Sequence, residues 1–216
     1  PMIIASILGT LGAIIIGVAI GLFTAIFLAL LYGVLNHDSF SKRRLFLWIP
    51  LLFALWGNTH AGVVEGFTFF VLFWAGMTVD NLFKFFRGKI EKKILINTSF
   101  LYLVVLLVSL FVTGIFISFI NPHGIRILLA PFDFYFQSFW KKMMLENLPL
   151  HGWLLGGIVA WTVVLFFLHL KVRGMNDIRF LLPSLAFAFF AFSAQRLILE
   201  YMIVSVPHMA VLIDQI

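Results

Sequence analysis

Residues 45–66, LFLWIPLLFALWGNTHAGVVEG, contain two apolar runs separated by a short polar corner. The first run ends in the letters WGNTH at 56–60, and the second run begins at once with Glu65 near its start. Apolar runs joined by such a tight turn are typical of consecutive membrane-spanning helices. The corner at 57–62 is also the first place in the chain at which polar side chains gather between two apolar segments.

The composition extends this interpretation to the whole chain. The sequence has 216 residues, of which 62% are hydrophobic and 11% are charged, and its mean hydropathy is +1.10. Soluble domains carry about a quarter charged residues, so the composition excludes an ordinary soluble domain. We predict an all-α fold, a polytopic transmembrane helix bundle of about six spans with one interfacial amphipathic helix.

The apolar runs set the predicted organisation, in which residues 1–216 form a single transmembrane domain. Residues 121–152 form an extracytoplasmic segment, and apolar positions at three- and four-residue steps predict an interfacial helix over 125–145 within it. The chain begins with Pro1 rather than Met, so we expect a fragment of a longer protein. We expect Pro207 to end the last span, because proline cannot continue the helical hydrogen bonds. The six predicted spans cover about residues 4–35, 45–57, 61–83, 94–120, 153–170 and 180–206.

Basic residues are distributed unevenly between the loops. Eleven of the 15 Lys and Arg residues lie in or beside the loops at 36–44, 84–93 and 171–179. Because Lys and Arg accumulate in cytoplasmic loops, we predict that these three loops face the cytoplasm. The corner at 57–62, the segment at 121–152 and the chain end would then face the other side. This distribution accounts for the net charge of +6 with the lipid bilayer as partner and without a nucleic acid.

Several kinds of chemistry have no support in the sequence. The chain has no cysteine, which excludes disulfides and thiolate metal sites. It contains no phosphate-binding or dinucleotide-binding glycine motif, and its six histidines lack metal-ligand spacing. We therefore predict neither a metal nor another cofactor. His37 and His169 fall at the cytoplasmic ends of spans, where we expect them to be solvated.

Three charged residues, Glu65, Arg196 and Glu200, stand out within the predicted spans, where ionisable groups are costly and often functional. Arg196 and Glu200 are four residues apart, so they either pair on one helix face or leave Arg196 to bind an anionic group such as phosphate. Glu65 either reaches the interface or lines a cavity. His60 either forms a hydrogen bond at the corner or acts as a base. At 1.5 Å per residue, these groups fall at the depth of three further polar residues, namely Asn58, Asn121 and His123.

Four short elements, in order along the chain, carry a family resemblance. The letters WGNTHAG at 56–62, followed by Gly66, resemble a W-x-N-x-H-G-G…G corner, and INPHG at 120–124 resembles an N-P-x-G element. Glu146 with Pro149 resembles E-W-x-P, and SAQR at 193–196 followed by Pro207 resembles a last-span Arg and Pro. The group with these elements consists of prokaryotic polytopic proteins related to the GT-C glycosyltransferases. The chain departs from the pattern by having Ala61 for Gly, Asn147 for Trp and Gln195 for Arg.

The resemblance implies transfer of a sugar from a polyprenyl-phosphate carrier at the extracytoplasmic face of a prokaryotic inner or plasma membrane. It also implies that the catalytic acidic residue lies upstream of Pro1, so none is assigned here. Arg196 would bind the carrier phosphate, and the helix at 125–145 would guide the lipid carrier. The sugar or acceptor site would be lined by Asn58, His60, Glu65 and Glu146. A secondary transporter and a non-catalytic membrane scaffold are the alternatives. The candidate residues are Asn58, His60, Glu65, Asn121, His123, Glu146, Arg196 and Glu200.

Overall fold

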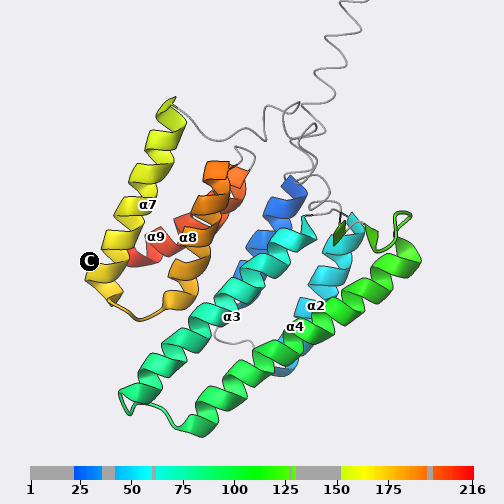
Figure 1. Cartoon of the computed structure of the whole chain (residues 1–216), viewed down its shortest axis with the longest axis horizontal. Coiled ribbons are helices and arrows are strands. Elements are labelled where there is room, and N and C mark those ends of the chain that lie inside the picture. Colours follow the sequence, from blue (N-terminus) through cyan, green and yellow to red (C-terminus); the bar gives the residue numbers. More distant parts are fainter. Residues whose placement is uncertain (1–21, 36–41, 60–61, 127, 130–151, 194–196) are drawn as a thin grey trace, which may run out of the picture.

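The computed structural model describes residues 22–35, 42–59, 62–126, 128–129, 152–193 and 197–216. These residues form helices and turns with no strand among them, which confirms the predicted all-α fold (Figure 1). The predicted first span before residue 22, nearly all of the predicted interfacial helix, and His60, Glu146 and Arg196 lie outside the described residues. The helices are Leu22–Leu35, α2 (Lys42–Thr59), α3 (Val63–Phe86), α4 (Lys92–Ile120), α7 (Gly152–Arg173), α8 (Ile178–Ser193) and α9 (Ile198–Ile213).

Among the described residues, three helices, α3, α4 and α7, are long and apolar enough to cross a membrane. Their lengths of 24, 29 and 22 residues correspond to about 33 to 43 Å of helix, which exceeds the ~30 Å hydrocarbon core. The other described helices are apolar but shorter. Four predicted spans agree to within about three residues with the bounds of α2, α3, α4 and α7. The chain therefore has the character of a membrane protein.

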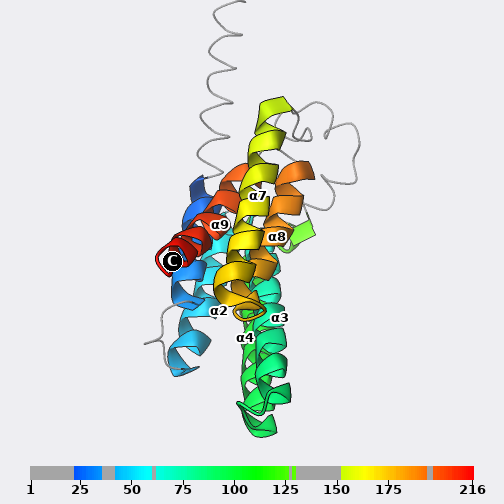
Figure 2. The same ribbon diagram turned by 90° about the vertical axis from the view of Figure 1, so that its left-hand side faces the viewer.

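The helices pack side by side in a bundle whose centre is largely aromatic. The α2 helix lies against α4, and α3 lies between α4 and α8, as the two perpendicular views show (Figures 1 and 2). Phe53 and Phe67 stack with their ring centroids 4.0 Å apart across the α2–α3 contact. Trp56, Phe69 and Phe73 are buried in the same core. Large apolar side chains cover much of the outside, as expected for helices that face lipid.

The predicted span over 180–206 is wrong, because the chain forms two helices there. The α8 helix ends at Ser193 and α9 begins at Ile198, so each has 16 residues and a length of only about 24 Å. Pro207 does not end a helix but lies inside α9, which continues to Ile213. Hydropathy alone treats 180–206 as continuous, because the polar letters SAQR at 193–196 are too few to interrupt the apolar average.

The break between α8 and α9 also corrects the predicted position of the chain end. The α9 helix runs back beside α7, and Arg173 Nε donates a hydrogen bond to Gln215 Oε1 at 3.1 Å. Residues 214–216 therefore lie at the same end of the bundle as the loop between α7 and α8, rather than at the opposite end (Figure 1).

The predicted separation of the basic loops from the polar corner agrees with the helix ends. The start of α2, the loop between α3 and α4 and the loop between α7 and α8 lie toward one end, which we call the basic end (Figure 1). The end of α2, the starts of α3 and α9 and the end of α4 lie toward the other, which we call the polar end (Figures 1 and 2).

Candidate functional site

Asn58 and Asn121, 63 residues apart in sequence, meet at the polar end. The Asn121 amide nitrogen lies 3.5 Å from the carbonyl oxygens of both Gly57 and Asn58. The Asn121 side-chain oxygen accepts the backbone N–H of His123 at 2.9 Å. Asn121 is buried, so its side chain joins the turn after α4 to the end of α2. Two of the four elements that carry the resemblance are thus in direct contact.

The end of α2 closes on itself through its own side chains. Asn58 donates its amide to the carbonyl of Ala54 at 2.8 Å, and the Thr59 hydroxyl donates to the carbonyl of Trp56 at 2.9 Å. The side-chain oxygen of Asn58 is buried and accepts no hydrogen bond from the described residues. A neutral amide oxygen in this position suits a hydroxyl or amide donor and does not act as an acid or base.

The remaining candidates at the polar end differ in exposure. Glu65 lies in the first turn of α3 and is half-buried. Glu200 lies in the first turn of α9 with only 5% of its surface exposed. His123 is exposed. The structure thus places these residues and the Asn58–Asn121 contact toward one end of the bundle, while His60, Glu146 and Arg196 lie outside the described residues.

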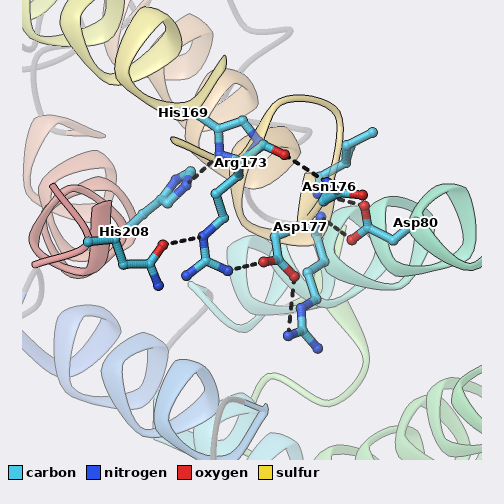
Figure 3. A network of polar contacts seen from close by, with 9 residues as sticks. Asp80, His169, Arg173, Asn176, Asp177 and His208 are labelled. Atoms are coloured by element: carbon cyan, nitrogen blue, oxygen red, sulfur yellow. Dashed lines mark hydrogen bonds and ion pairs between the residues drawn. The ribbon is translucent and has the colours of Figure 1, made fainter. Parts of the chain in front are cut away.

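A polar network that the sequence interpretation missed lies at the basic end (Figure 3). Asp80 of α3 is buried, and its carboxylate accepts the backbone N–H groups of Ile178 at 2.8 Å and Arg179 at 3.2 Å. These are free N–H groups of the first turn of α8, so a carboxylate from another helix caps α8. Asp177 just before that helix pairs with Arg173 and, at 3.5 Å, with Arg179.

Asp80 is a fourth charged residue within the predicted spans, and the selection of three was incomplete. It lies at residue 80 of the apolar run 61–83 and is only 4% exposed. The signal was present in the sequence, because an isolated carboxylate in an apolar run needs a partner. What the sequence lacked was the identity of that partner, which comes from a helix 98 residues later.

His169 was predicted to be solvated, and this prediction is wrong. Its side chain is 0% exposed, and its Nδ1 lies 3.0 Å from Nε2 of His208 on α9. The position near the end of α7 suggested solvation, but α9 returns along α7 and covers that face. The missing signal was the division of the last predicted span into α8 and α9.

Polar pairs continue along the whole contact between α7 and α9. The Thr162 and Tyr201 hydroxyls are 2.7 Å apart, and the Trp161 indole donates to the Ser205 hydroxyl at 3.1 Å. The histidine pair follows toward the basic end. Buried hydrogen bonds of this kind hold helices together where the surrounding medium is apolar.

Within the described residues, no three His, Asp or Glu side chains converge as a metal site would require. Comparison with protein-family models, with curated proteins and with solved structures gives no match for this chain.

Proposed function

We propose that this chain is part of an integral membrane glycosyltransferase that takes a sugar from a polyprenyl-phosphate carrier. In this proposal the basic end faces the cytoplasm, and the polar end receives the carrier headgroup at the opposite membrane surface of a prokaryotic cell. Arg196 binds the carrier phosphate, and Asn58, His60, Glu65 and Glu146 line the site for the sugar or its acceptor.

One observation carries the proposal, namely the contact of Asn121 with residues 57 and 58. Two elements of the GT-C-like pattern, far apart in sequence, form one buried corner. The corner lies at the end away from the basic loops (Figure 1). A lipid-linked phosphate would lie at this depth, near the membrane surface. The buried residue Glu200 lies in the first turn of α9 at the same end.

The test uses the full-length protein that contains this chain, reconstituted with polyprenyl-phosphate sugars carrying a radiolabelled sugar. We expect labelled product, and we expect Arg196→Ala to lower both transfer and binding of the unlabelled carrier. Arg126→Ala is the matched control, since Arg126 is an exposed arginine in the turn that follows α4. Equal carrier binding by Arg196→Ala and Arg126→Ala would refute the role of Arg196.

A secondary transporter is the second candidate, and the division of the last predicted span favours it. Transporters often bind their substrates beside interrupted helices, and α8 and α9 are two 16-residue helices in place of one span. Uptake of a labelled solute into proteoliposomes without a covalent product would support transport over sugar transfer.

A further inference from the structure

Three buried side chains from three helices form a continuous hydrogen-bonded chain near the basic end. Ser184 of α8 lies 3.3 Å from Nδ1 of His208 on α9, and Nε2 of His208 lies 3.0 Å from Nδ1 of His169 on α7. Ser184, His208 and His169 are 0%, 3% and 0% exposed. Figure 3 shows the two rings meeting edge to face beside Arg173.

The hydrogen bonds of Ser184 determine which nitrogen donates in each of the two histidine contacts. The Ser184 hydroxyl donates its proton to the carbonyl of Phe180 at 2.8 Å, so its oxygen is left to accept a hydrogen from Nδ1 of His208. A neutral imidazole carries one N–H, and Nε2 of His208 therefore accepts from Nδ1–H of His169. Nε2 of neutral His169 is then a bare, buried nitrogen that forms no hydrogen bond with the described residues.

A single added proton fits this arrangement and a second does not. A proton on Nε2 of His169 leaves every existing bond of the three side chains in place. The bond between His169 and His208 then becomes charge-assisted, which strengthens it. A second proton would put N–H groups on both facing nitrogens and break the 3.0 Å bond.

We propose that His169 and His208 form a buried site that binds one proton and shares it across the contact between α7 and α9. The proton comes from water at the basic end, and its uptake raises the charge of the pair by one. This site is separate from the polar end and does not depend on the proposed sugar transfer.

The surroundings set when the site is filled. The Arg173 guanidinium on α7 lies beside the two rings (Figure 3). Arg173 is itself paired with Asp177 in the following loop, Asp80 faces the same loop from α3, and α8 contributes Arg179 to it. Asp214 at the end of α9 is exposed. An imidazole ordinarily gains its second ring proton in mildly acidic solution. We therefore expect the pair to take up its proton as the pH is lowered, and the stronger bond then tightens α7 against α9.

The test follows the ring nitrogens of ¹⁵N-histidine-labelled full chain in phospholipid nanodiscs by NMR as the pH is lowered. At neutral pH we expect both rings to carry their hydrogen on Nδ1. In acid we expect the pair to take up one additional proton, with the signals of His169 Nδ1 and His208 Nε2 moving together. His169→Gln and His208→Gln assign the signals, and His123→Gln identifies a histidine outside the pair.

Ser184→Ala keeps both rings and removes only the group that accepts from Nδ1 of His208, so we expect uptake to move to lower pH by about half a unit or more. Ser109→Ala is the matched control, because Ser109 is equally buried and donates to its own helix at Val105. Hydrogen on Nε2 of both rings at neutral pH, two separate uptake steps, unfolding before uptake, or equal effects of the two serine variants would each overturn the proposal.

Discussion

Replacing Gly76 with alanine tests a close approach between the backbones of α3 and α8. A Cβ atom at Gly76 would lie 2.6 Å from the Cα of Arg179 and 2.8 Å from its backbone nitrogen. Carbon atoms pack at about 3.5 Å, so α3 and α8 would have to separate by about 1 Å. The obstacle is backbone, which no side-chain rotation relieves.

The separation would also weaken the cap that Asp80 provides. Its bonds to the N–H groups of Ile178 and Arg179 measure 2.8 and 3.2 Å, and a further 1 Å would take both beyond hydrogen-bonding range. Overpacking costs about 1–3 kcal/mol, and a hydrogen bond to a charged group contributes about 1.5–3 kcal/mol. Alanine recovers about 1 kcal/mol of helix propensity. Loss of the whole cap, with both bonds, costs about 2–4 kcal/mol. We therefore expect Gly76→Ala to lower the free energy of unfolding by about 2–6 kcal/mol.

The assay is reversible unfolding in mixed micelles with increasing denaturing detergent, followed by circular dichroism. Gly114→Ala is the matched control, because Gly114 lies inside α4 with no atom within 4 Å of its Cβ position. We expect the control to be at least as stable as the parent chain. Equal stability of Gly76→Ala and Gly114→Ala would refute the packing of α3 against α8 described above.

Two further predictions concern buried contacts and use the same assay. Asp80→Ala leaves two buried N–H groups of α8 uncapped, and we expect it to lower the free energy of unfolding by about 2–4 kcal/mol. The control, Asp214→Ala at an exposed position, should change this free energy by less than about 0.5 kcal/mol. Similar effects of the two variants would contradict the cap. Gly66→Ala places a Cβ 2.2 Å from the Trp56 ring and should lower the free energy of unfolding by about 1–3 kcal/mol. Adding Trp56→Phe to this variant should restore part of that free energy, because the smaller ring leaves space for the Cβ. Gly156→Ala, which meets open space, is the control, and a double variant no more stable than Gly66→Ala alone would argue against this contact.

The sequence predicted the helices well where a long apolar run is bounded by charge or by a helix-stopping pair. The α4 helix is the clearest case, with Lys92 at one end and Asn121-Pro122 at the other. It failed at the last span, because the few polar letters between α8 and α9 hardly change the hydropathy. That single error placed the chain end at the wrong end of the bundle and left His169 without a covering helix.

For the candidate site, the depth estimate put the corner at 57–62 level with Asn121 and His123, and in the structure Asn121 contacts that corner. Their role in binding a carrier lipid stays a prediction. The network around Asp80 could not be predicted, because a capping contact depends on which helix end lies opposite the carboxylate. Only the packing of α3 against α8 determines this.

The most direct measurement of the central claim, that the polar and basic ends face opposite sides of a membrane, uses the absence of cysteine from the chain. Single cysteines at three exposed positions, His123→Cys, Lys89→Cys and Asp214→Cys, are labelled with a membrane-impermeant maleimide in intact bacterial cells and in inverted vesicles. We predict that the cysteine at 123 reacts only in cells and that those at 89 and 214 react only in inverted vesicles. Labelling of positions 123 and 89 from the same side, or of position 214 together with position 123, would contradict the account.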